Sequence, residues 1–337
     1  MQNVGFSTGE FFDEERCNWT SDGRRPIAWS AWYPAKDRLN ASINATRDAS
    51  ASLFVKDDVM ADAVPVRGHF LPTVIFSHGT GGSAAGMSWF ALRLAAAGYL
   101  VLGVDHHGNT ATEKYRPEGF LCWWERARDL TVLLDHQMED GPFAGLIDPD
   151  RIFVAGFSLG GYTAVACLGA LTYLDLYRQW AGDSPLGRGP REFPNAIDHL
   201  DQLLGQSAEF AASMKRQSLD YADTRFKAAL LCAPAPTVRG FTDESVRAIH
   251  VPVLTFVGGA DREAPADPCA KWLDDRLRNS RLERLAPDIG HYVFLNECTE
   301  AGCQAIPEIC VDAPGVDRRA IHDRVAAAAI TFFAGIE

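Results

Sequence analysis

The chain of 337 residues, 47% hydrophobic and 23% charged, has the composition of a globular protein and not of a disordered or fibrous one. Its formal net charge of -12, from 44 acidic and 32 basic residues, argues against binding to nucleic acid or to an anionic membrane surface. The length allows one large core that carries an insertion.

Neither a membrane span nor an export signal is evident in the sequence. No run of about 18 uninterrupted apolar residues occurs, and the N-terminus lacks the basic-then-apolar order of a signal peptide. We therefore expect no stable membrane insertion and a cytoplasmic location. Cys298, Cys303 and Cys310 crowd one loop and could form a disulfide, which leaves a periplasmic or secreted location open. Without a CxxC pair or neighbouring histidine ligands, we predict no metal site.

Short apolar runs alternate with longer helical patterns, which predicts βαβ units and a mostly parallel sheet flanked by helices. Strands are expected at residues 27–33 (an antiparallel edge strand), 73–77, 99–104, 151–155, 228–232, 251–257 and 281–285. Helices are expected at residues 83–97, 120–138, 158–170, 267–279 and 317–333. In the last helix Asp317 is the expected N-cap, and Ile321, Val325, Ala328 and Phe332 are expected to face the sheet.

Two stretches interrupt this alternation. Residues 35–70 are rich in Ala, Ser and Asp and form an irregular insertion. Residues 171–227 are too long for a plain connection, and helical patterns at 196–204 and 208–219 predict a helical insertion. The expected organisation is a core of residues 1–170 and 228–337, with residues 171–227 as a helical lid.

The strongest motif is Gly156-Phe157-Ser158-Leu159-Gly160, a G-x-S-x-G sequence between a predicted strand and a predicted helix. The turn between them is so tight that side chains two residues before and after the serine would clash, and glycine avoids this. The same turn strains the serine backbone and presents the hydroxyl at a helix N-terminus, where the helix dipole favours developing negative charge. Ser158 is therefore the predicted nucleophile.

A serine hydroxyl needs a base, and proteins with this turn supply it from a loop after a later strand. His291 follows the predicted strand at 281–285 and a glycine that permits a sharp turn, so it is the predicted base. The competing histidines are less suitable. His250 precedes a strand, His322 lies within the last helix, and His199 lies within the insertion.

The acid that orients the base is expected between the nucleophile and the histidine in the chain. Asp261 lies a few residues beyond the predicted strand at 251–257 and is the predicted acid. Asp267 is the alternative, but it precedes Pro268 and opens a helix, so capping suits it better.

Backbone N–H groups that stabilise an oxyanion are expected from Leu159, which follows the nucleophile, and from Thr80 in a glycine-rich loop. In that loop His78 is expected to brace the backbone through hydrogen bonds rather than to act as a second base. Trp123, Trp124 and His107 are candidates to line a substrate pocket, with helix packing an equal alternative for one of the two tryptophans.

Two further arrangements have simpler interpretations. Asp105-His106-His107 lacks a spaced third ligand for a metal ion, so loop structure or pocket lining is expected there. Arg126 and Asp129 have helical i,i+3 spacing and are expected to form a surface pair.

Four segments resemble the dienelactone hydrolase-like and platelet-activating-factor acetylhydrolase-like branches of the α/β-hydrolases: Trp32-Tyr33-Pro34, Phe76-Ser77-His78-Gly79, Val104-Asp105-His106-His107-Gly108-Asn109 and Gly156-Phe157-Ser158-Leu159-Gly160-Gly161. The resemblance implies an α/β-hydrolase fold and an esterase that cleaves carboxylic esters, often with short acyl groups, without a cofactor. Two differences limit it. Dienelactone hydrolases proper use cysteine where Ser158 stands, and the acetylhydrolases place the acid where this chain has Ala233 and Pro234.

The predicted function is hydrolysis of a small-molecule ester through an acyl-enzyme on Ser158, with His291 as base and Asp261 as orienting acid. An amidase or peptidase and an acyltransferase are alternatives that would use the same residues. An inactive hydrolase fold used for binding is a third alternative. The sequence leaves a homodimer open.

Overall fold

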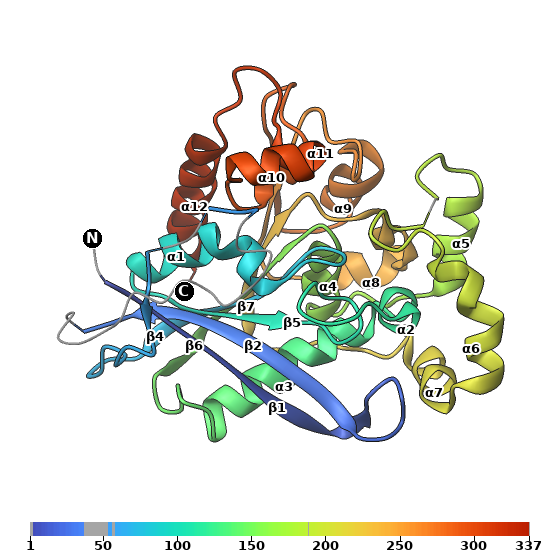
Figure 1. Cartoon of the computed structure of the whole chain (residues 1–337), viewed down its shortest axis with the longest axis horizontal. Coiled ribbons are helices and arrows are strands. Elements are labelled where there is room, and N and C mark those ends of the chain that lie inside the picture. The colour runs from blue at the N-terminus through green and yellow to red at the C-terminus, as the bar shows by residue number, and fades with distance from the viewer. Residues whose placement is uncertain (1–2, 37–52, 56–57, 188, 337) are drawn as a thin grey trace.

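A computed structural model describes residues 3–36, 53–55, 58–187 and 189–336 (Figure 1). In this part of the chain a nine-stranded sheet has the order β3-β1-β2-β5-β4-β6-β7-β8-β9. The strands are β1 (Val4–Cys17), β2 (Arg24–Pro34), β3 (Met60–Ala61), β4 (Leu71–Ser77), β5 (Leu100–Asp105), β6 (Ile147–Phe157), β7 (Phe226–Cys232), β8 (Val253–Val257) and β9 (Ser280–Arg284).

Strands β5, β4, β6, β7, β8 and β9 pair parallel to one another, which confirms the predicted mostly parallel sheet. Strand β2 is antiparallel to β5, as expected, but the prediction that it forms the edge is wrong. Strand β1 pairs along its other side from Val4 to Cys17, and β3 pairs with β1. Sequence analysis missed β1 because solvent-facing polar residues interrupt its apolar positions.

The helices are α1 (Ser88–Ala96), α2 (Pro117–Leu121), α3 (Glu125–Glu139), α4 (Leu159–Cys167), α5 (Leu174–Gly182), α6 (Leu200–Gln206), α7 (Ala208–Arg216), α8 (Asp243–Ala248), α9 (Trp272–Asp274), α10 (Glu300–Ala305), α11 (Pro307–Cys310) and α12 (Arg318–Ala334). Shorter or irregular turns are η2 (Ala84–Met87), η3 (Ala196–His199), η4 (Pro236–Gly240), η5 (Asp267–Lys271) and η6 (His291–Phe294).

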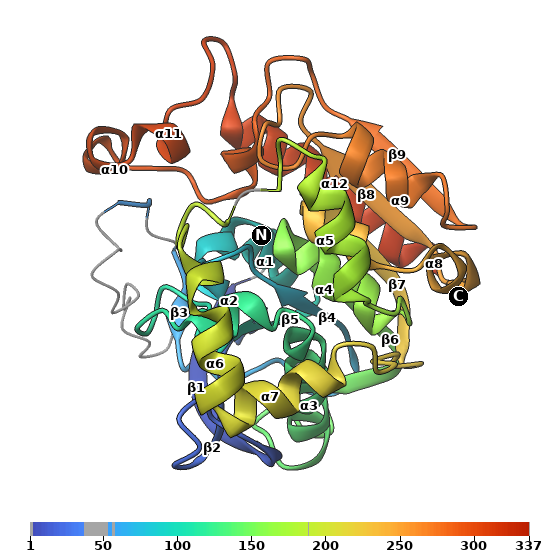
Figure 2. The same cartoon turned by 90° about the vertical axis from the view of Figure 1, so that its right-hand side faces the viewer.

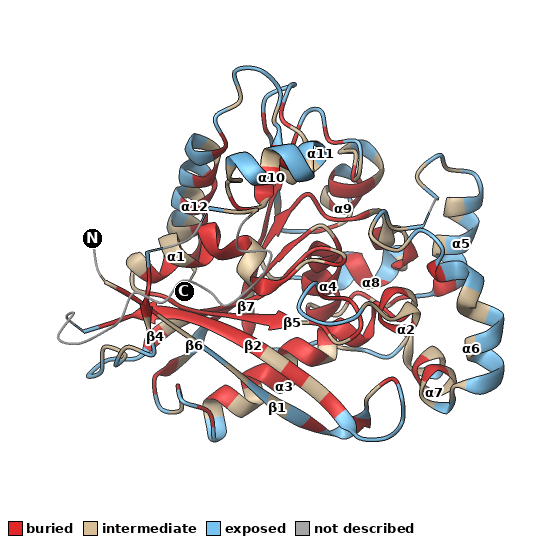
Figure 3. Cartoon of the chain, in the orientation of Figure 1, coloured by how far each residue is buried: buried red, intermediate tan, exposed pale blue. Residues whose placement is uncertain are grey.

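Helices cover both faces of the sheet (Figures 1 and 3). Side chains alternate between the faces because successive strand residues point to opposite sides. Val74 and Phe76 pack in the cluster that includes residues of α1 and α12, whereas Ile75 packs in the cluster that includes residues of α3 and α4. The central strands are thus buried on both sides, which explains their continuous apolar sequences.

The last helix begins as predicted, since the Asp317 side chain accepts a hydrogen bond from the Ala320 N–H at 3.0 Å. The predicted inner face is partly wrong. Val325 is buried together with His322, Ala326, Ala329 and Phe333, whereas Ile321, Ala328 and Phe332 are only half-buried and pack at the border of the same core cluster. His322 directs this face inward because its ring stacks on Trp89 at 4.0 Å and donates to the Val293 carbonyl at 2.7 Å.

Residues 171–227 contain α5, η3, α6 and α7, which lie along one side of the molecule (Figure 2). Exposed residues predominate in α5 and α6, whereas most of α7 is half-buried or buried (Figure 3). The irregular insertion expected at residues 35–70 lies partly outside the described residues, namely at 37–52 and 56–57.

A disulfide joins Cys298 to Cys310, while Cys303 keeps a free thiol. The crosslink closes a segment that contains α10 and most of α11, beside the pocket described below. None of the helices within the described ranges is long and apolar enough to span a bilayer.

Candidate active site

Ser158 occupies the sharp turn between β6 and α4, with backbone angles φ 53° and ψ -117°. A positive φ is strained for a residue with a side chain, and the turn is held by the Ser158 N–H, which donates to the Cys232 carbonyl at 2.9 Å. The flanking glycines are required sterically. A Cβ on Gly156 would lie 1.9 Å from the Gly160 carbonyl oxygen, and a Cβ on Gly160 would lie 1.8 Å from the Ser77 carbonyl oxygen.

His291 and Asp261 form a buried pair in which His291 Nδ1 lies 2.7 Å from Asp261 Oδ2. His291 opens η6, and Asp261 lies in the loop after β8. The other carboxylate oxygen, Oδ1, accepts hydrogen bonds from the N–H groups of Glu263 at 3.0 Å and Ala264 at 2.7 Å. The carboxylate is therefore held on both sides, and His291 must donate its Nδ1 proton to it.

The electrostatic surroundings favour the charged form of His291. Burial by itself lowers the pKa of this group, but the carboxylate of Asp261, with smaller contributions from Glu263 and Glu192, outweighs burial and raises the pKa above the ordinary value of 6.5. The alternative acid, Asp267, lies on the exposed surface and pairs with Arg284 at 2.6 Å.

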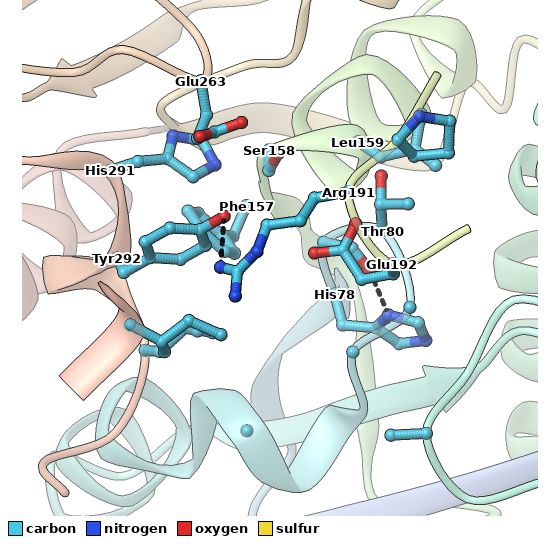
Figure 4. A pocket seen from close by; sticks show the side chains of 18 of the residues that line it. His78, Thr80, Phe157, Ser158, Leu159, Arg191, Glu192, Glu263, His291 and Tyr292 are labelled. Atoms are coloured by element: carbon cyan, nitrogen blue, oxygen red, sulfur yellow. Dashed lines mark hydrogen bonds between the residues drawn. The ribbon is translucent and has the colours of Figure 1, made fainter. Parts of the chain in front are cut away.

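Ser158 and His291 line one cavity of about 470 Å³ together with Thr80 and Leu159 (Figure 4). No hydrogen bond among the described residues joins the Ser158 hydroxyl to the His291 ring. Such contacts are often long before substrate binds. The cavity has the size of an ordinary small-molecule site.

The Thr80 and Leu159 N–H groups donate no hydrogen bond to any group in the described part of the chain, and both residues line the cavity. Contacts from the loop after β5 hold the backbone next to Thr80. Asn109 Oδ1 accepts from the Gly81 N–H at 2.6 Å, and the Tyr115 hydroxyl donates to the Gly81 carbonyl at 2.7 Å. Gly81 itself has φ +61°, which suits glycine.

His78 braces the same loop, as expected. Its Nδ1 donates to the Gly79 carbonyl at 2.6 Å, and its Nε2 accepts from the His106 N–H at 3.2 Å. Burial, with the nearby positive charge of Arg126, holds the pKa of His78 well below its ordinary value. With both ring nitrogens bonded to backbone, His78 has none left to serve as a base.

Comparison with known proteins identifies the family. The model described as "Alpha/beta hydrolase family" matches residues 74–302, more than half of the chain. The chain belongs to the alpha/beta hydrolase family.

Two known proteins illustrate the likeness of this alpha/beta hydrolase to others. "Putative esterase YitV" of Bacillus subtilis (strain 168) is 27% identical over 212 residues, which cover 60% of this chain and 74% of that protein. The solved structure of a ferulic acid esterase from Streptomyces cinnamoneus matches with a TM-score of 0.66 and 19% identity, covering 99% of this chain and 90% of the other. The structural match shows a shared fold. The narrower branches suggested by the sequence motifs remain a prediction.

The pocket residues expected from sequence divide into two groups. Trp123 lines the cavity of the hydrolase. Trp124 and His107 do not line it, so pocket lining is wrong for these two residues; Trp124 packs in the core and His107 contributes to loop structure, which were the alternatives. Trp124 is fully buried and donates from its indole to Ser213 at 3.0 Å, and His107 contacts Glu113 at 2.8 Å beneath Trp19.

Arg126 and Asp129 are not a surface pair, because both are buried. Arg126 donates to the Ser77 hydroxyl at 3.1 Å and also to the His78 carbonyl, so it supports the loop beside the site. Asp129 accepts from Arg25 at 2.8 Å and pairs with His106 at 2.9 Å. The i,i+3 spacing alone does not reveal that Arg126 and Asp129 are buried, since their partners come from other elements.

Sequence analysis missed several charged and polar residues of the cavity, namely Arg191, Glu192, Glu263 and Tyr292 (Figure 4). Two of them come from the insertion, where no motif marks them. Within the described residues, no group of three or more His, Cys, Asp or Glu side chains is placed to hold a metal ion.

Proposed function

We propose that this alpha/beta hydrolase is a serine esterase that cleaves carboxylic esters. The observation that carries the proposal is the buried His291–Asp261 pair, which opens on the same cavity as the strained Ser158 turn. Two relatives support esters as the substrate class, since one is named a putative esterase and the other a ferulic acid esterase.

In the proposed mechanism Ser158 attacks the ester carbonyl while His291 Nε2 takes the hydroxyl proton. Asp261 accepts the hydrogen bond from the Nδ1–H of His291, so the ring proton stays on Nδ1 and the lone pair of Nε2 is free to take the serine proton. The bond to the alcohol then breaks, and His291 returns the proton to that leaving group. Water repeats the sequence on the acyl-enzyme, releasing the acid and restoring the Ser158 hydroxyl.

The negative charge on the carbonyl oxygen would be stabilised by the N–H groups of Thr80 and Leu159, which lack protein acceptors in the described structure. The Leu159 N–H also lies at the N-terminus of α4, where the helix dipole favours an anion. Preorganised donors of this kind supply a large part of the rate enhancement in acyl transfer.

Residues 171–227 are proposed as a lid that selects the substrate. Support comes from Tyr177, Leu186 and residues 189–192, all of which line the cavity. The proposed preference for small or short acyl groups rests on the resemblance of the sequence motifs to hydrolase branches that often act on short acyl groups.

An activity panel and a covalent probe test the function. We expect hydrolysis of p-nitrophenyl esters, fastest for short acyl chains, and much slower hydrolysis of the matching p-nitroanilides. A fluorophosphonate probe is expected to label Ser158, as read by mass spectrometry of the labelled peptide. Faster anilide cleavage would favour an amidase, and an unlabelled, inactive protein would indicate a hydrolase fold without catalysis.

The raised pKa of His291 predicts the acidic side of the pH profile. A general base works only in its neutral form, so activity is lost as pH falls through its pKa. For p-nitrophenyl acetate we expect kcat/KM to rise with pH through an apparent pKa above 6.5, because the carboxylates around His291 raise it. Glu263→Gln should move this midpoint to lower pH. A wild-type midpoint below 6.5 would contradict the prediction.

A further inference from the structure

The inference concerns Glu192, a half-buried residue of the insertion that lines the cavity. Its Cβ and Cγ pack against Gly81, since a Cβ built on that glycine would lie within 2.9 Å of both atoms. Figure 4 shows its side chain next to Thr80. The carboxylate therefore lies beside the loop proposed to stabilise the oxyanion, within reach of a bound substrate.

Among the described residues, no Lys, Arg or His side chain forms a direct ion pair with Glu192. The guanidinium of its neighbour Arg191 forms its ion pair with Glu308 instead and lies over the Tyr292 ring at 5.8 Å, so it acts on Glu192 only from a distance. Burial raises the pKa of Glu192 and outweighs the nearby positive charges of Arg191 and His291, which lower it, while the weaker influence of Glu263 acts in the same direction as burial. A carboxylate that is partly desolvated and unpaired gains most from a ligand that brings a positive charge.

The surroundings of Glu192 suit an organic cation rather than a small hydrated ion. The cavity wall includes the rings of Tyr115, Phe120 and Trp123. Tyr115 and Phe120 pack edge to face with ring centres 5.1 Å apart. Aromatic faces combined with a carboxylate are the usual recognition chemistry for substituted ammonium groups.

We propose that the substrates of this hydrolase are esters that carry an organic cation, and that Glu192 is the specificity-determining residue that holds the ammonium group. The inference rests on the proposed esterase function and names its substrate class. The second carboxylate at the cavity, Glu263, adds to the negative potential, because it acts on both Glu192 and His291. The same potential would disfavour esters that carry a carboxylate.

Two esters of the same shape test the proposal: butyrylcholine and its neutral carbon isostere, 3,3-dimethylbutyl butyrate. Acid release in a pH-stat gives kcat/KM for each. For the wild-type protein we expect about a tenfold preference for the cationic ester, which corresponds to about 1.4 kcal/mol. In Glu192→Gln the ratio should fall close to one. In Asp175→Asn, which removes the same charge from an exposed helix position outside the cavity, the ratio should stay at the wild-type value.

The ratio does not depend on how much protein is folded, so a partly unstable variant still reports on specificity. A second measurement needs no variant: tetramethylammonium should inhibit hydrolysis of p-nitrophenyl acetate competitively, and neopentyl alcohol should inhibit at least several-fold more weakly. Equal turnover of the two butyrates, or a ratio unchanged by Glu192→Gln, would overturn the inference while leaving the esterase function intact. Absence of p-nitrophenyl acetate hydrolysis would overturn both.

Discussion

Replacing Ser158 by alanine is expected to lower kcat for p-nitrophenyl acetate by roughly a millionfold, as loss of a serine nucleophile does in other hydrolases. The reason is chemical: alanine has no hydroxyl to form the acyl-enzyme, and only the oxyanion donors and the binding site remain. The fold should be unaffected, because the Ser158 hydroxyl makes no hydrogen bond among the described residues, whereas its backbone N–H contact to Cys232 persists.

The measurement is steady-state hydrolysis with the thermal unfolding midpoint as a check on folding. Ser218→Ala is the matched control, since this serine lies in the insertion and does not line the cavity. We expect that control to keep wild-type activity. Hydrolysis retained in Ser158→Ala would refute the assignment of the nucleophile and the mechanism that follows from it.

Replacing Asp261 by asparagine is expected to lower kcat about ten-thousandfold. The asparagine oxygen can still accept from the Glu263 and Ala264 N–H groups, as Asp261 Oδ1 does now. The amide nitrogen would then face His291 Nδ1 and donate to it. The imidazole proton would have to reside on Nε2, where it prevents removal of the Ser158 proton.

Asp267→Asn separates this effect from a general loss of negative charge. Asp267 was the alternative acid in the sequence, but it is exposed and pairs with Arg284. We expect Asp267→Asn to keep kcat within about twofold of wild type, as surface changes of this kind have small effects. A large loss in Asp267→Asn, or a small one in Asp261→Asn, would show that the orienting acid has been misassigned.

Local sequence was sufficient for the features that depend on adjacent residues. The G-x-S-x-G turn is one such feature, because its two glycines avoid the clashes that side chains would make within a single strand-to-helix connection. The parallel strands are another, since burial on both faces requires unbroken apolar runs. The positions of Asp261 and His291 were predicted in the same way, as each follows a strand within a few residues.

Tertiary structure decided what depends on contacts between distant segments. Strand β1 is a strand because it pairs with β2, although its own residues alternate irregularly between apolar and polar. Arg126 and Asp129 are buried because Ser77, His106 and Arg25 approach them from elsewhere in the chain. Their i,i+3 spacing is equally compatible with a solvent-exposed pair.

The same division between local sequence and tertiary contacts applies to the candidate site. Sequence alone indicated a nucleophile, a base and an acid, because the reaction demands those groups in that chain order. Which side chains line the cavity was decided by how residues 171–227 pack against the rest of the chain, and this packing brings Glu192 beside Gly81 from more than a hundred residues away. The candidate reactive residues can be predicted from local motifs. The shape and charge of the cavity depend on packing between distant segments, and no sequence motif marks those segments.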